Sequence, residues 1–107
     1  MKALTISCVV ALGLTAAAPA FANLDLAKKS NCMACHAVDK KVVGPAYLDV
    51  AKKYAGDKGA EAMLAKRIKG GTAANGGQKW GSLPMPPNNV SDADAKALAK
   101  WILSGAK

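Results

Sequence analysis

The most specific pattern in this sequence is Cys32-Met33-Ala34-Cys35-His36. The spacing Cys-x-x-Cys-His is the attachment signature of a c-type haem. The two thiols lie nearly one helical turn apart, so each can add to a vinyl group of the haem. The adjacent His36 is then held under the iron as its proximal ligand. The motif therefore predicts one covalently bound haem c, attached through Cys32 and Cys35 and ligated by His36.

Three other uses of the two cysteines have to be weighed against this prediction. A thioredoxin-like redox pair would need a βαβ surround, and the sequence shows no strand signal. A zinc site would need a fourth ligand, but the chain has a single histidine and otherwise only scattered acids. A structural disulfide explains neither the adjacent His36 nor what fills the core of so small a domain. The haem interpretation accounts for more of the sequence than any of these.

The first 22 residues have the pattern of a secretory signal peptide. Lys2 provides a positively charged start, residues 3–18 are apolar apart from Thr and Ser, and Pro19 precedes Ala20-Phe21-Ala22. This ending favours cleavage after Ala22. The alternative is a transmembrane anchor, but the apolar run is short for a span and has no stop-transfer basic cluster beside it. We therefore expect residues 1–22 to be removed, a single domain over residues 23–107, and a periplasmic location.

The composition indicates that the side chains alone provide too little apolar volume for a stable core. The chain has 107 residues, only 5% of them aromatic, and a formal net charge of +8. Domains this small usually depend on a disulfide framework, a metal or a cofactor. Two cysteines separated by two residues close too small a loop to act as such a framework. A haem would supply the large flat apolar body that the side chains do not.

The hydrophobic pattern predicts short helices joined by Gly/Pro turns, and hence an all-α fold. Helices are expected over residues 24–31, from Gly44-Pro45 to about residue 56, over residues 60–69, and after Ser91. Pro45 would occupy an early helical position, where its missing N–H costs nothing. Ser91 followed by Asp94 is a capping signal. The last helix carries one apolar stripe, formed by Ala95, Leu98, Ala99 and Ile102. Tyr47 and Tyr54 are expected to pack with their hydroxyl groups near the surface.

The second axial ligand of the iron is expected to be Met85. No second histidine exists, and methionine is a suitable soft ligand. Met33 lies inside the attachment loop, on the histidine side, and Met63 lies mid-helix at core spacing. Met85 lies in the stretch Leu83-Pro84-Met85-Pro86-Pro87-Asn88, where three prolines restrict the backbone and present the thioether at little ordering cost.

Over essentially all of residues 23–107 the chain resembles the small bacterial class I cytochromes of the cytochrome c551/c8 type. Six stretches carry the resemblance: Cys32-Met33-Ala34-Cys35-His36, Val43-Gly44-Pro45-Ala46-Tyr47, Arg67-Ile68-Lys69, Trp80-Gly81, Pro84-Met85-Pro86-Pro87-Asn88 and Ala99-Lys100-Trp101-Ile102-Leu103. It implies a fold of about four short helices wrapped around one covalent haem. The chain departs from the family in residues 71–79, which form a longer connection, richer in Gly and Asn.

The resemblance also implies roles for individual residues. His36 and Met85 would be the axial ligands, and the Pro45 carbonyl would accept a hydrogen bond from the second nitrogen of His36. Arg67 and Trp80 would bond a haem propionate. Asn88 would bond the sulfur of the axial ligand Met85.

Two protein ligands would leave no open position on the iron. We therefore expect a soluble one-electron carrier of the periplasm, working between respiratory redox partners, and not an enzyme. The alternative is a gas-binding or peroxidase-type haem protein with an open iron position. The lysine pairs 28–29, 40–41 and 52–53 suggest partners with acidic docking patches, such as a cytochrome bc1-type donor and a terminal oxidase, nitrite reductase or peroxidase acceptor. No nucleic acid, no stable membrane insertion and a monomeric state are expected.

Overall fold

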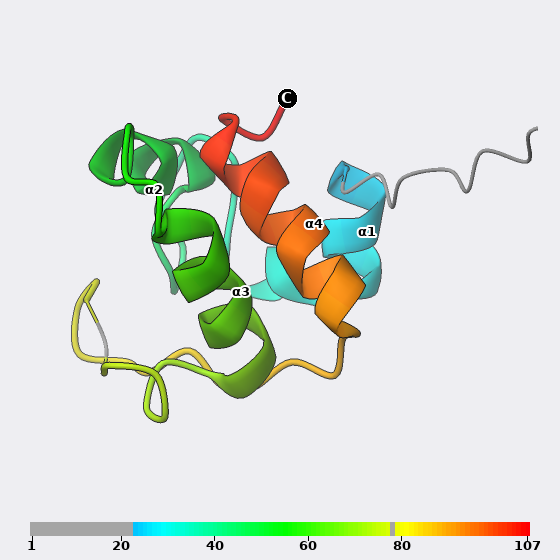
Figure 1. Ribbon diagram of the computed structural model, residues 1–107, viewed down its shortest axis with the longest axis vertical. Coiled ribbons are helices and arrows are strands. Elements are labelled where there is room, and N and C mark those ends of the chain that lie inside the picture. Colours follow the sequence, from blue (N-terminus) through cyan, green and yellow to red (C-terminus); the bar gives the residue numbers. More distant parts are fainter. Residues whose placement is uncertain (1–22, 78) are drawn as a thin grey trace, which may run out of the picture.

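Four α-helices and one 3₁₀ turn run through residues 23–77 and 79–107, the part of the chain that the computed structural model describes (Figure 1). The elements are α1 (Leu24–Lys29), the 3₁₀ turn η1 (Cys32–Ala34), α2 (Tyr47–Lys53), α3 (Ala60–Gly70) and α4 (Asp92–Leu103). Within these ranges there is no strand, only an isolated bridge between His36 and Lys41. The predicted all-α fold is confirmed. The expected signal peptide, residues 1–22, lies outside the described residues.

Side chains cap the first and the last helix. The Leu26 N–H donates to Oδ1 of Asn23 at 3.0 Å, and the Asp94 N–H donates to Oγ of Ser91 at 3.1 Å, which confirms the predicted cap. Lys69, near the end of α3, pairs with Asp92 in the first turn of α4 and holds the pKa of that carboxyl below its usual value. The start of α4 is thus tied to the end of α3.

Three predicted helix boundaries are wrong, one of them the end of α2, which lies at Lys53 rather than near residue 56. α1 ends at Lys29 rather than at residue 31, because Asn31 adopts a left-handed conformation with φ of 61°. α2 begins at Tyr47, so Pro45 precedes the helix and its extended N-cap, Ala46. The Tyr47 N–H donates to the carbonyl of Ala37, an upstream loop residue, at 3.0 Å. A contact that distant in sequence determines where α2 starts.

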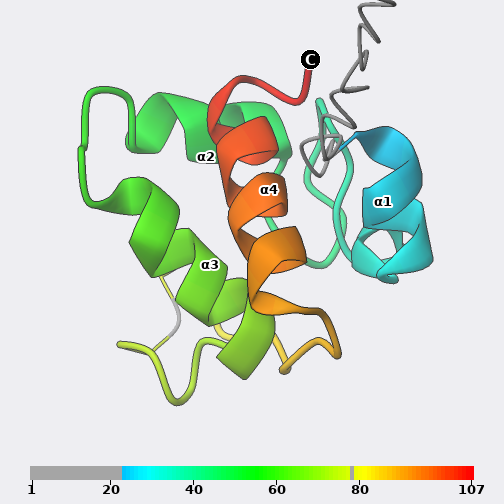
Figure 2. The ribbon, with the colours of Figure 1, turned by 45° about the vertical axis from the view of Figure 1, so that its right-hand side comes forward.

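The core forms where α4 packs against α3 and α2 (Figures 1 and 2). The predicted apolar stripe of α4 is buried, and Trp101 on the same helix is buried beside it. Among the large side chains of residues 23–77 and 79–107, only Leu98 is less than 2% exposed. The protein's own core is therefore thin, and much of its apolar surface faces a cavity. None of the helices in the described ranges is long and apolar enough to cross a membrane.

Candidate haem-binding site

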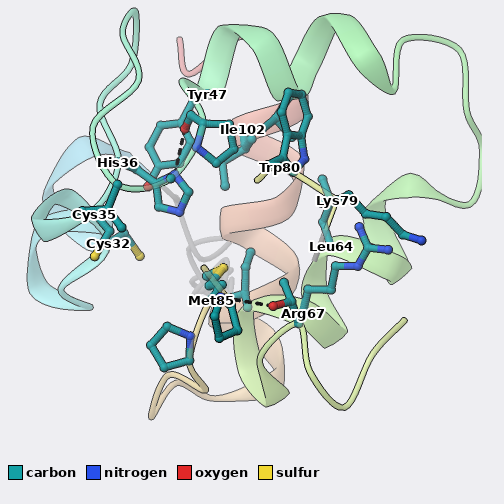
Figure 3. A pocket seen from close by; sticks show the side chains of 18 of the residues that line it. Cys32, Cys35, His36, Tyr47, Leu64, Arg67, Lys79, Trp80, Met85 and Ile102 are labelled. Atoms are coloured by element: carbon teal, nitrogen blue, oxygen red, sulfur yellow. Dashed lines mark hydrogen bonds between the residues drawn. The ribbon is translucent and has the colours of Figure 1, made fainter. Parts of the chain in front are cut away.

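A cavity lined mainly by apolar atoms lies between the helices, the attachment motif (residues 32–36) and the methionine loop (residues 83–88) (Figure 3). The space between these residues amounts to about 990 Å³, a figure that includes solvent at its open mouth. Leu64 and Ile68 of α3 and Leu98 and Ile102 of α4 form part of its wall. Seven of the eight predicted site residues line it: Cys32, Cys35, His36, Pro45, Arg67, Trp80 and Met85.

His36 is oriented by the loop that follows it. Its Nδ1 lies 2.8 Å from the carbonyl oxygen of Pro45. A carbonyl can only accept, so Nδ1 carries the hydrogen and Nε2 keeps its lone pair for a metal. The Gly44 N–H donates to the Cys35 carbonyl at 2.7 Å, which folds this loop back against the motif. The predicted contact between Pro45 and His36 is therefore present in the structure.

Tyr47 also contacts His36, and the expectation for its hydroxyl group is wrong. Its ring stacks on the imidazole at 5.2 Å between centroids and meets Trp101 edge-on at 5.4 Å. Tyr47 is only 2% exposed, and burial raises the pKa of its hydroxyl. The sequence pattern identified a packing residue but contained no signal that α2 would begin directly against the imidazole.

Gly44 is required by the close approach of the loop to His36. A Cβ at this position would overlap Cε1 of the imidazole and lie 2.8 Å from its Nδ1. We expect Gly44→Ala to displace the ring and to lower the free energy of unfolding by about 1–3 kcal/mol, the usual cost of overpacking. Denaturant unfolding of the holoprotein measures this cost.

Gly59→Ala is the matched control, since its Cβ would meet nothing closer than Oδ1 of Asp57 at 3.5 Å. It should change the unfolding free energy by less than about 1 kcal/mol. Equal effects of the two substitutions would contradict the steric role of Gly44.

The two thiols lie at one edge of the cavity (Figure 3). The 3₁₀ turn Cys32–Ala34 brings them there, and the His36 N–H closes the turn on the Cys32 carbonyl at 3.0 Å. Both cysteines are free, Cys32 being buried and Cys35 half-buried. Burial raises the pKa of the Cys32 thiol. The motif thus places two thiols and one imidazole around the same cavity.

Met85 lies across the cavity from His36 (Figure 3). Its loop is attached to the end of α3, where the Asn88 backbone N–H and side-chain Nδ2 both bond the Ile68 carbonyl, at 3.2 and 2.9 Å. Asn88 Nδ2 also lies 3.4 Å from the Pro86 carbonyl. Asn88, the eighth predicted residue, therefore supports the loop from outside the cavity lining.

Arg67 and Trp80 lie away from the cysteines, near Lys79 (Figure 3). Arg67 is only 8% exposed and donates from Nε to the Asn75 carbonyl and from Nη1 to the Tyr54 hydroxyl, both at 3.2 Å. The one ion pair found in the described ranges is that of Lys69 with Asp92, so no carboxylate of these ranges neutralises Arg67. A buried cation at the rim of a cavity suits an anionic group of a ligand. Trp80, which follows residues 71–79, lies in the lining as predicted.

These groups fit a haem attached through two thioethers. Two free thiols, an imidazole with an available Nε2, a thioether opposite it and a buried cation surround one largely apolar space. Residues 24–106 match the family model described as Cytochrome c. The chain belongs to the cytochrome c family. The cofactor of this family is a covalently bound haem c, and the protein is an electron-transfer protein and not an enzyme. This excludes the zinc site, the thioredoxin-like redox pair and the peroxidase as interpretations of the sequence.

Relatives within this family cover from about three quarters to nearly all of the chain. Cytochrome c-552 of Nitrosomonas europaea is 54% identical over 97% of this chain and 98% of its own length. Cytochrome c-551 of Pseudomonas aeruginosa is 60% identical over 74% of this chain and 72% of its own. The crystal structure of wild-type Nitrosomonas europaea cytochrome c552 superposes with a TM-score of 0.70 and 61% identity, covering 76% of this chain and 96% of that one. These likenesses confirm the resemblance to small class I c-type cytochromes.

Proposed function

We propose that the protein is a periplasmic one-electron carrier whose haem iron is held by His36 and Met85. The observation that carries the proposal is the placement of these two side chains on opposite sides of one cavity, with Cys32 and Cys35 at its edge (Figure 3). The haem, when bound, supplies an iron that takes up and releases one electron. Every other property of the site comes from the chain itself.

The two ligands favour electron transfer over reaction at the metal. The Pro45 carbonyl accepts a hydrogen bond from Nδ1 of His36, which leaves Nε2 free to bind the iron and makes the imidazole more basic. The Met85 thioether is a soft ligand that raises the reduction potential. With both axial positions filled by the protein, a gas or peroxide has no free position to bind. The same ligands in both redox states keep rearrangement small, which favours rapid electron exchange.

Four further residues have proposed roles at the cofactor. Arg67, buried without a carboxylate partner in the described ranges, and the Trp80 indole would contact a haem propionate. Lys53 Nζ lies 4.6 Å from the Trp80 ring centroid and adds positive charge at this side. Asn88 would direct an amide hydrogen to the Met85 sulfur by turning the N–H that makes the long, 3.4 Å bond to the Pro86 carbonyl, while the other N–H stays on Ile68.

An absorption spectrum of the purified holoprotein tests the ligation. We expect a weak far-red sulfur-to-iron band in the oxidised form and no spectral change when carbon monoxide is added to the reduced form at neutral pH. The reason is that Met85 occupies the position that carbon monoxide would take. Prompt binding of carbon monoxide would support the gas-binding alternative instead.

We further propose export to the periplasm and docking to acidic redox partners. The signal-peptide pattern of residues 1–22 supports export, and the mass of protein recovered from the periplasm checks cleavage after Ala22. Lys52, Lys53 and Lys79 are exposed, and Lys53 and Lys79 lie beside the Trp80 side of the cavity. Electron-transfer rates with a natural partner should therefore fall severalfold as ionic strength rises. A flat response to salt would contradict electrostatic docking.

A further inference from the structure

Residues 84–87 of the methionine loop have one backbone N–H donor, and it bonds Thr72. In the stretch Pro84-Met85-Pro86-Pro87 three residues are prolines without an N–H, so Met85 carries the only amide hydrogen. That N–H donates to Oγ1 of Thr72 at 2.9 Å, as the dashed line beside Met85 in Figure 3 shows. In return the Thr72 N–H donates to the Met85 carbonyl at 3.0 Å. One residue thus bonds both backbone polar groups of Met85.

Thr72 is itself held in place by the turn of residues 72–77 that it begins. Its carbonyl accepts from the N–H groups of Asn75 and Gly77, at 3.1 and 2.8 Å. The Asn75 side chain donates to the carbonyls of Lys66 and Gly71, at 3.2 and 2.8 Å, which ties this turn to the end of α3. The Thr72 hydroxyl is therefore presented by a turn that is anchored on both sides.

Gly71 allows this turn to touch the methionine loop. Its φ of +79° is a conformation that L side chains rarely adopt, and a Cβ there would lie 2.9 Å from both the Met85 carbonyl oxygen and the Pro87 nitrogen. The two backbones are consequently packed directly against each other. Prolines stiffen the methionine loop internally, but only a contact from outside can fix where the stiff loop sits.

We propose that Thr72 is a positioning residue that keeps the Met85 loop closed over the haem and so limits replacement of the sixth ligand. The inference rests on the proposed ligation by Met85 and goes beyond it by naming what holds that ligand in place. Thr72 lines the cavity beside Met85, so its hydroxyl acts at the point where the loop would open. The turn of residues 72–77, bonded to the end of α3, supplies this support.

Two variants of the holoprotein separate the hydroxyl from the shape of the side chain. Thr72→Val keeps the branched shape and removes the acceptor of the Met85 N–H, whereas Thr72→Ser keeps the hydroxyl. We expect the Met85 amide hydrogen to exchange about three to ten times faster in Thr72→Val, the range for one lost hydrogen bond. External imidazole should displace the methionine faster by a similar factor, and Thr72→Ser should restore both rates.

Each outcome decides the proposal. Unchanged exchange of the Met85 amide in Thr72→Val would overturn the contact itself. Faster exchange with unchanged imidazole entry, in a protein that has the far-red band, would overturn the positioning role while leaving ligation by Met85 intact. If Met85→Ala keeps the far-red band of the parent, the proposed ligation fails, and the inferred limit on ligand replacement falls with it.

Discussion

Met85→Ala is expected to open the sixth position of the iron and to lower the reduction potential of the protein. The thioether is a weak donor that favours the reduced iron, and water or hydroxide in its place favours the oxidised form. We expect a fall on the order of 0.1 V, a fraction of the roughly 0.8 V over which axial ligands set haem potentials. The far-red band should disappear, and carbon monoxide should bind promptly to the reduced form.

Met63→Ala is the matched control for this prediction. Met63 is a partly buried side chain that packs against the core from α3. Its truncation removes packing and should lower stability by about 1–3 kcal/mol, less than for a fully buried methionine. The far-red band and the potential should stay close to those of the parent. An unchanged band in Met85→Ala, or its loss in Met63→Ala, would contradict the assignment of the ligand.

The double variant Cys32→Ala, Cys35→Ala is expected to lose both the covalent haem and the fold. Leu64, Ile68, Leu98 and Ile102 face the cavity, and without a covalently held occupant these walls would be exposed to water. A domain this small has little other apolar burial to compensate. We expect helical circular dichroism to fall to that of an unfolded chain and the cooperative thermal transition to disappear.

Single substitutions and a change inside the motif provide the controls. Cys32→Ala and Cys35→Ala each leave one thioether and should retain haem through acid extraction, with reduced stability. Met33→Ala lies between the two cysteines but leaves both thiols and His36 in place, so haem content should be unchanged. Native helix content in the double variant, measured without haem, would show that the polypeptide core is sufficient by itself.

Local patterns predicted the helices and most of their starts, but not the start of α2. The apolar stripe of α4 and its Ser91 cap involve residues three or four positions apart, and both were confirmed. The start of α2 was misplaced because the carbonyl of Ala37 bonds the Tyr47 N–H from outside the helix. Nothing in residues 44–47 alone contains that partner. Boundaries fixed by contacts between distant residues are beyond what periodicity and capping signals can predict.

The cofactor chemistry was readable from the sequence because it depends on residue types at short spacing. Two thiols and an imidazole within five consecutive residues indicate haem attachment whatever the neighbouring sequence is. The family match over residues 24–106 confirmed the cofactor. Met85 could be singled out because prolines and the absence of a second histidine left few candidates. Arg67 and Trp80 were predicted through family resemblance, and the structure brings both to the cavity.

The sequence by itself therefore determined the cofactor, the all-α class and the set of candidate ligands. Family resemblance predicted the contact of Pro45 with His36, and the structure contains it. Only the tertiary structure decided the other two supports: Tyr47 stacked on the same imidazole, and Thr72 on the backbone of Met85. The physical reason is the range of the contacts. A motif works through neighbours along the chain, whereas Thr72 and Met85 are thirteen residues apart and meet only because α3 ends where the methionine loop returns.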